Sequence, residues 1–211
     1  MPARRTAEKR PAVLVYQLEL TLAEVEPRIW RRLRVTDDLT LESLHLTFQH
    51  AMGWTNSHLY EFEIDGRRFS EPDPEDEVFE QPCEDAGRTR LRELDLRAGS
   101  EFTYVYDFGD WWEHRVVIES VSPLRSREVA PCCVDGARAG PPEDSGGPHG
   151  YEELLVALRD PRHPEHRSAS EWTPTGFDPE AFDGEATTEL LQHFHGKRRG
   201  RARRTTSRRA R

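Results

Sequence analysis

The chain has little cysteine, almost no lysine and no long apolar run. Its 211 residues include three cysteines, Cys83, Cys132 and Cys133, and two lysines, Lys9 and Lys197. An odd cysteine count with an adjacent pair excludes the dense disulfide framework of small secreted domains and is typical of a reducing compartment. No stretch reaches the about 18 consecutive apolar residues of a transmembrane helix. We therefore expect a cytoplasmic protein without a membrane partner.

Charge is distributed unevenly along the chain. Residues 1–10 carry four basic groups and one acid, whereas residues 197–211 carry nine basic groups and no acid. The residues between them carry 17 basic and 38 acidic groups, a net charge of -21. Such a body repels nucleic acid, so that partner would need the basic ends or a local patch. We expect disordered basic segments at 1–11 and 197–211 and one domain at 12–196.

Alternation of apolar and polar residues predicts a series of short strands. Asp65-Gly66 marks a tight hairpin, and the aromatic face of Phe102, Tyr104, Tyr106 and Phe108 is expected to be core. A loop without order is expected at 70–90, where residues 71–85 hold eight acids, three prolines and no basic group. The strands are expected at residues 13–22, 29–35, 60–64, 67–69, 102–108 and 114–118.

Helical spacing of apolar residues follows a different pattern and predicts three helices. The clearest spans Leu41 to Met52, with Thr40 as N-cap and Gly53 as stop. Two more are expected at 151–158 and 186–194, the last ended by Gly196. We predict an α+β fold in which a mixed sheet carries the first helix on one face. The order of elements favours a β-grasp-like, ubiquitin-like arrangement extended by C-terminal helices.

Five groups of residues occur in an order that is typical of one family. They are Pro27–Arg32, Ala51–Trp54 with Ser57–Leu59, Tyr106–Asp110 with Trp112–His114, Pro141–Asp144 with Gly146–Gly147, and Phe177–Asp183. From about Tyr16 to Phe194 the chain thus resembles the plasmid pRiA4b ORF-3-like protein family. Members of this family are found on plasmids, near insertion sequences and on bacterial chromosomes. The resemblance implies an α+β domain of unsettled role, associated with mobile elements. Some members are called resolvase-like, but no Ser or Tyr here has the setting of a recombinase nucleophile.

The resemblance also bears on zinc. Members of the family often carry a cysteine on each side of the Pro-Pro-Glu-Asp motif, where this chain has Gly140 and Ser145. With Cys132 and Cys133 retained, a thiolate zinc site would have at most half of its sulfur ligands. The resemblance therefore gives little support to zinc in this chain.

Carboxylates and an imidazole gather around one predicted turn. Asp107, Asp110, Glu113 and His114 lie within eight residues, and Glu143-Asp144 come from a loop that can cover them. These groups suit a divalent cation, with Asp107, Asp110 and His114 as candidate ligands, and they suit acid/base catalysis. In the alternative, Asp107 and Asp110 bond backbone amides in the turn. His58 either joins a cleft or caps a turn, and no organic cofactor is indicated.

A basic patch stands inside the acidic body. Arg28, Arg31, Arg32 and Arg34 surround Trp30, a combination that suits phosphate or single-stranded nucleic acid. The same arginines can instead pair across the hairpin with Glu19, Glu24 and Glu26. In the tail, Arg198 and Arg199 are further candidates for phosphate contacts.

Two functions remain open on these observations. The first is a non-enzymatic binding module that engages a protein or nucleic-acid partner. The second is a metal-dependent phosphoester hydrolase, with Asp107, Asp110 and Glu143 or Asp144 as ligands and His114 as acid/base.

Overall fold

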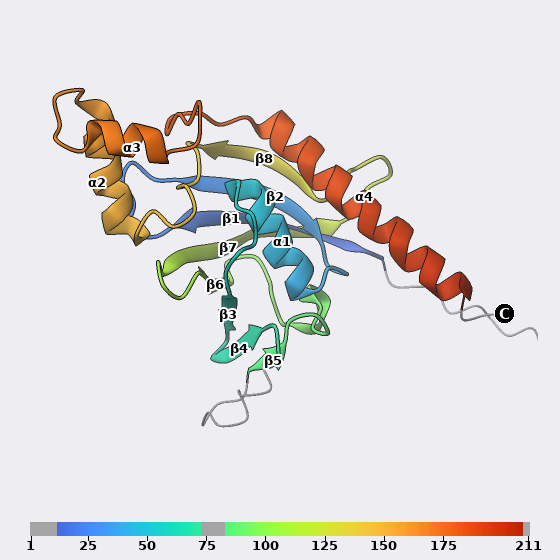
Figure 1. The fold of residues 1–211 in the computed structure, drawn as a ribbon. Coiled ribbons are helices and arrows are strands. Elements are labelled where there is room, and N and C mark those ends of the chain that lie inside the picture. The colour runs from blue at the N-terminus through green and yellow to red at the C-terminus, as the bar shows by residue number, and fades with distance from the viewer. Residues whose placement is uncertain (1–11, 73–82, 209–211) are drawn as a thin grey trace, which may run out of the picture.

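The computed structural model describes residues 12–72 and 83–208, which form one sheet with helices around it (Figure 1). The strand order is β5-β4-β3-β6-β7-β1-β2-β8. Neighbours are antiparallel except β4 and β5, so the predicted α+β fold with a mixed sheet is confirmed, whereas the order does not confirm the β-grasp detail. The strands are β1 (Leu14–Leu22), β2 (Trp30–Thr36), β3 (Tyr60–Ile64), β4 (Arg67–Ser70), β5 (Glu84–Asp85), β6 (Glu101–Tyr106), β7 (Trp112–Pro123) and β8 (Cys132–Ala137).

The centre of the sheet follows from the period-two pattern of β1. Leu18 and Leu20 are fully buried, and Leu18 lies opposite Leu33 of β2 and Ile118 of β7. Burying each such side chain contributes roughly 1.5–3 kcal/mol, so the face that the sequence makes apolar decides which side of the sheet is covered.

Helix α1 (Leu41–Met52) covers that apolar face. The Thr40 side chain accepts a hydrogen bond from the Ser43 amide, and Gly53 ends the helix with a φ of 86°. Leu41, Leu44 and Phe48 are fully buried in the core. This helix and both of its ends are as predicted, because spacing and caps agree.

The remaining helices differ from the expectation in their bounds. Helix α2 (Gly147–Arg159) begins earlier than 151, and a short helix α3 (His166–Trp172) follows it at one end of the sheet (Figure 1). Helix α4 (Gly184–Arg208) does not stop at Gly196, so it continues through residues 197–208, which the sequence assigned to a structureless tail. A glycine costs a helix only about 1 kcal/mol, and the arginines and the single alanine that follow before Arg208 are good helix formers.

Two further expectations need correction. The acidic segment is ordered at its end, because β5 pairs with β4, while residues 73–82 lie outside the described residues. Phe108 is 45% exposed, although Phe102, Tyr104 and Tyr106 are buried as predicted. Strand β6 ends at Tyr106, so Phe108 lies in the turn and no longer alternates with the core face. Among the described helices, none is long and apolar enough to cross a membrane.

Candidate functional site

A closed ring of hydrogen bonds fixes the segment between α1 and β3. The imidazole of His45 lies 2.8 Å from the Tyr104 hydroxyl at Nδ1 and 2.5 Å from Asn56 Oδ1 at Nε2. Gln49 donates to the same hydroxyl and accepts from the Asn56 amide. Burial lowers the pKa of His45 to about 4, so its imidazole is neutral and donates from one nitrogen only. This ring holds Asn56 in the left-handed region, with a φ of 59°, and so places His58 two residues later.

The turn between β6 and β7 supplies the first carboxylate. Asp107 has a φ of 59°, and its Oδ1 accepts a hydrogen bond from the Gly109 amide at 2.9 Å. Its own amide donates to the Leu59 carbonyl, which ties the turn to the His58 segment. The structural role predicted for Asp107 is therefore present, and it uses only one of the two carboxylate oxygens.

Close backbone packing positions the loop that carries Glu143 and Asp144. A side chain at Gly140 would place its Cβ 2.2 Å from the Met52 carbonyl oxygen, and one at Gly147 would lie 2.4 Å from that of Asp110. The Trp54 indole also donates to the Pro141 carbonyl at 2.9 Å. The loop is thus held against the end of α1 and against the β6–β7 turn, which brings Asp144 over His58.

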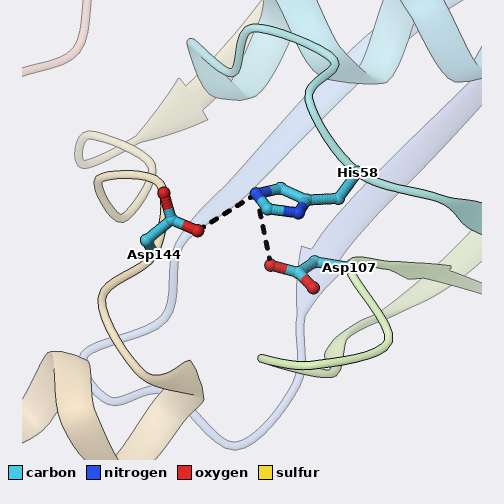
Figure 2. A group of neighbouring side chains, drawn as sticks. All are labelled: His58, Asp107 and Asp144. Carbon is cyan, nitrogen blue, oxygen red and sulfur yellow. Dashed lines mark ion pairs between the residues drawn. The ribbon is translucent and has the colours of Figure 1, made fainter.

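Three side chains from these separate segments converge on one point (Figure 2). His58 Nε2 lies 3.2 Å from Asp144 Oδ1 and 3.6 Å from Asp107 Oδ2. The three potential ligand atoms all lie within 4.8 Å of one another. His58 Nε2 is buried but has no well-directed hydrogen bond among the described residues. One imidazole and two carboxylates at this spacing can hold a divalent cation.

Glu143 borders this group and is fixed by its own hydrogen bonds. Its Oε1 accepts from the Thr55 amide and hydroxyl, and the Tyr106 hydroxyl donates to both of its oxygens at 3.1 and 3.2 Å. Burial raises the pKa of Tyr106, and the negative charge of Glu143 raises it further, so this hydroxyl keeps its proton. Glu143 Oε2 lies 3.9 Å from His58 Nε2, close enough to exchange a proton through one water molecule.

A pocket of about 670 Å³ opens beside His58 and Asp107. It runs between α1 and the segment from Asn56 to Tyr60, and Phe108 of the β6–β7 turn forms part of its wall. Four carboxylates line it, Glu42, Glu71, Asp85 and Asp107, and its described lining contains no lysine or arginine. A ligand in this pocket would therefore lie directly beside the three converging side chains.

The structure separates the predicted site residues into two sets. Asp107, Glu143 and Asp144 come together, as the sequence suggested. His114 is fully buried instead, where its Nδ1 donates to the Trp112 carbonyl, and burial lowers its pKa to about 3. Asp110 accepts a hydrogen bond from the Gly146 amide and Glu113 is exposed on β7, so neither belongs to the group.

Comparisons with known proteins place these residues in a family context. The family model described as "Plasmid pRiA4b ORF-3-like protein" matches residues 14–186. The chain belongs to this family. All residues of the converging group lie within the matched range.

Two relatives of this pRiA4b ORF-3-like chain are themselves without an assigned function. It is 39% identical over 194 residues to the uncharacterized protein y4hQ of Sinorhizobium fredii, covering 91% of this chain and 98% of the relative. The crystal structure of a protein of unknown function, MM3350 from Methanosarcina mazei Go1, matches with a TM-score of 0.75 and 34% identity, over 83% of this chain and 98% of the other. This chain therefore shares its fold with an archaeal protein, and no activity comes with that likeness.

The arginine patch of this family member is neutralised by its neighbours. Arg32 pairs with Glu19 and Glu119 at 3.1 and 2.7 Å, and Arg34 pairs with Glu128. Arg28 pairs with Glu19, and Arg28 and Arg32 both lie over the Trp30 ring. Arg31 is buried and donates to backbone carbonyls, including that of Ala51. The side chains of Arg198 and Arg199 lie outside the described part.

For His58 the sequence left two alternatives open, a place in a cleft or a cap on a turn. A single histidine after a helix end carries no spacing that distinguishes a ligand from a turn cap. The available signal was its place in the family-like motif, two residues after Asn56, which the hydrogen bonds of His45 and Gln49 fix. Among the described residues, only His58, Asp107 and Asp144 form a group with the spacing of metal ligands. The described cysteines belong to no such group.

Proposed function

We propose that this chain binds a divalent metal ion through His58, Asp107 and Asp144 and uses it for hydrolysis of a ligand held in the adjoining pocket. The observation that carries the proposal is the convergence of these three ligand atoms within 4.8 Å. Three protein ligands leave coordination positions open for water and substrate, as catalytic metal sites do. Mixed nitrogen and carboxylate ligands favour manganese, iron or zinc over magnesium and calcium.

The electrostatic cost of bringing Asp107 and Asp144 together supports the proposal that a metal ion binds between them. Two carboxylates about 4 Å apart repel by roughly 4 kcal/mol at an effective dielectric constant near 20, so the group requires a cation, an arginine or protonation, and a bound metal ion meets this requirement. Asn56, Asp107 and Asp144 also adopt positive φ angles of 58–59°, which are uncommon for residues other than glycine. Three such residues at one place agree with a functional site, where backbone strain tends to concentrate.

The residues divide the proposed chemistry among themselves. A divalent ion at the site lowers the pKa of water and so supplies a nucleophile near neutral pH. Glu143 is placed to accept the proton of that water and to pass it to the leaving group as the scissile bond breaks. The acidic lining repels a phosphoester, the substrate suggested by the sequence, unless the ion offsets its charge. An uncharged ester or amide bond therefore suits the pocket better.

Thermal melting with and without metal tests the binding step. At a hundred times its dissociation constant, a bound ion stabilises the fold by about 2.7 kcal/mol, a shift of several degrees. We expect that shift with manganese or zinc and its loss in Asp144→Asn, because asparagine tolerates the left-handed backbone but removes the charge. Asp65→Asn is the matched control, since Asp65 has a φ of 50° in the β3–β4 turn. Equal shifts in the parent and Asp144→Asn would rule out this site.

Activity tests the hydrolytic step separately. The metal-loaded protein is offered p-nitrophenyl phosphate, p-nitrophenyl butyrate and lysine p-nitroanilide. We expect release of p-nitrophenol or p-nitroaniline from an ester or amide, and its loss in both Asp144→Asn and Glu143→Gln. If the protein binds metal but hydrolyses none of the three substrates, the hydrolase proposal is wrong and only the metal-binding proposal stands.

A second candidate is the binding module, with a protein partner. The observation that favours it is an exposed apolar rim beside the site, where Phe108 and Trp111 are 45% and 54% exposed with ring centroids 6.1 Å apart. Leu59, 59% exposed, adjoins the same turn. Peptides selected by display on the parent should bind Trp111→Ser at least tenfold more weakly, while its metal-dependent melting stays unchanged. Selection that yields no Trp111-dependent peptide would count against this candidate.

A further inference from the structure

The second half of helix α4 differs in charge from the rest of the molecule. Residues 197–208 form a basic arm, the last turns of the helix, with six arginines, one lysine and no acid. The last acidic residue of the sequence is Glu189. No basic residue of the arm therefore has a carboxylate three or four positions away along the helix, the spacing at which helical ion pairs form.

The first half of α4 anchors this arm to the fold. Leu191 and His195 are buried where the helix packs against β8 and α1. The Thr188 hydroxyl accepts a hydrogen bond from the Cys133 amide at 2.9 Å and donates to the Cys133 carbonyl at 3.1 Å. Beyond these contacts the helix continues without a break and runs past the sheet (Figure 1). The arm therefore projects from the body.

Helical spacing places part of this charge on one side of the arm. Four basic residues follow each other at intervals of four, three and four positions, namely Lys197, Arg201, Arg204 and Arg208. At about 3.6 residues per turn these positions fall within a stripe about 60° wide. Leu190, seven positions before Lys197, lies on the same side and is 45% exposed, whereas the buried Leu191 lies on the side toward the sheet. The stripe therefore continues the side of α4 that faces away from the sheet.

The charge and the residue types of the arm suit the phosphates of double-stranded DNA. Residues 197–208 span about 18 Å of helix, and the same length of duplex carries about ten phosphate charges. Arginine can donate two parallel hydrogen bonds to one phosphate, which makes it the favoured side chain for this contact. The major groove of DNA, about 12 Å wide, also admits an α-helix. The arm thus matches the duplex in charge, in length and in shape.

Other anionic partners suit the arm less well. A helix that lies on a membrane needs a large apolar face, but residues 197–208 contain one alanine and no larger apolar residue. Single-stranded nucleic acid is held by bases that stack on aromatic side chains, and the arm has no aromatic residue. The major groove of an RNA duplex is deep and narrow, so a helix does not enter it as it enters that of DNA.

We infer that the basic arm of α4 binds double-stranded DNA through its phosphates, without preference for a base sequence. Residues 11–196 carry a net charge of -21 and repel DNA, and the arginines of β2 are already paired, so the contact is confined to the arm. The inference goes beyond the proposed function and does not depend on it, because it concerns where the protein is held and not which bond it hydrolyses.

The salt dependence of binding tests the inference on the full-length protein. Fluorescence anisotropy of a labelled 24-base-pair duplex is measured in EDTA between 50 and 200 mM salt. If all seven basic residues contact phosphates, the slope of log affinity against log salt is about -6, and we expect a value between about -4 and -6. No binding at 50 mM salt, or an affinity that does not depend on salt, would overturn the inference.

A triple variant assigns the binding to the stripe. Arg201→Gln, Arg204→Gln and Arg208→Gln together remove three charges and keep good helix formers, so circular dichroism should show the helical content of the parent. We expect the slope to become shallower by about 3 and the affinity at 100 mM salt to fall at least tenfold. A slope equal to that of the parent would overturn the inference.

The matched control removes three charges from the acidic body. Arg88→Gln, Arg162→Gln and Arg167→Gln change arginines that are 89%, 92% and 90% exposed and leave the same net charge as the triple variant of the arm. The control should keep the slope of the parent, because none of these residues lies on the arm. Equal losses of affinity in the two triple variants would mean that only the net charge matters, and would overturn the inference.

Competition tests the identity of the partner. The labelled duplex is displaced with unlabelled DNA duplex, single-stranded DNA, RNA duplex, phosphatidylserine vesicles and polyglutamate at equal concentrations of charge. DNA duplex should be the strongest competitor. If vesicles or polyglutamate compete as strongly, the arm binds a membrane or an acidic protein instead and the inference is wrong. The same holds if single-stranded DNA or RNA competes as strongly.

The inference and the proposed function fail separately. Asp144→Asn should lose the metal-dependent shift and keep DNA binding, because Asp144 lies in the loop before α2 and not on α4. The triple variant of the arm should keep the metal-dependent shift and lose DNA binding. Metal binding without DNA binding in the parent would remove the inference alone.

Discussion

The arginines of β2 and the carboxylates around His58 are both dense in charge, but their charges are balanced in different ways. Arg32 lies opposite Glu19 in the β1–β2 register and pairs with it, so the sheet itself brings opposite charges together. The carboxylates of the pocket come from α1, β5 and two loops, and no lysine or arginine is found in its described lining. Charges that the fold already neutralises serve the fold. Carboxylates that the fold gathers around an imidazole, as it does Asp107 and Asp144 around His58, indicate a ligand.

The histidines show the same contrast. His45 and His114 are buried, hydrogen-bonded within the core and neutral. His58 lines the pocket, and its Nε2 faces two carboxylates and has no well-directed hydrogen bond in the described part of the chain. His45 and His114 therefore contribute to the stability of the fold, whereas His58 is part of the candidate site.

The largest expected effect concerns pH and the two buried histidines. Burial lowers the pKa of His45 to about 4 and that of His114 to about 3, whereas both titrate near 6.5 in the unfolded chain. Below pH 6.5 the unfolded chain therefore binds more protons, and stability falls as the pH drops toward 4. Each histidine should remove roughly 2–3 kcal/mol at pH 4.5. Denaturant unfolding between pH 4.5 and 7.5 measures this loss.

A variant assigns that loss to the residues. His114→Gln should lower the pH dependence by about half, since glutamine does not take up the proton. His149→Gln, at a position 84% exposed, should leave the dependence unchanged. Parallel profiles of His114→Gln and the parent would contradict the assignment.

The next largest effect concerns the loop that carries Glu143 and Asp144. Gly147→Ala places a Cβ 2.4 Å from the Asp110 carbonyl oxygen at a φ of 69°, so the loop must move. We expect a loss of about 2 kcal/mol or more and the disappearance of the metal-dependent shift. Gly66→Ala, at a φ of 72° with no atom within 4 Å, is the control: it should cost stability through the backbone alone and keep metal binding. A metal response retained in Gly147→Ala would contradict the placement of Asp144.

The smallest effect concerns the arginine side. Arg32→Ala removes the partner of Glu19 and Glu119 on a partly exposed surface, where such networks contribute about 1 kcal/mol or less. We expect a melting temperature lower by a few degrees at low salt, a smaller difference in 1 M salt, and no change in metal binding. A loss of 3 kcal/mol or more would mean that the arginines act as a buried network.

Sequence periodicity predicted the central strands and α1, because each has a continuous pattern and, for α1, two caps. It could not predict β5, since two residues carry no period, nor the end of α4, since Gly196 resembles a stop. Residue type and motif predicted Asp107, Glu143 and Asp144 as candidates, and the structure brings them together beside His58. His114 was chosen over His58 because it is close to them in sequence, whereas the site is assembled by contacts such as Gly140 against Met52 that no local pattern encodes.

The most direct test is a crystal of the protein soaked in manganese and measured for anomalous scattering. The account predicts one strong peak within about 2.5 Å of His58 Nε2, Asp107 and Asp144, and its absence in crystals of Asp144→Asn. A map without a peak at His58, from crystals whose open site is free of lattice contacts, would contradict the claim that these three residues form a metal site.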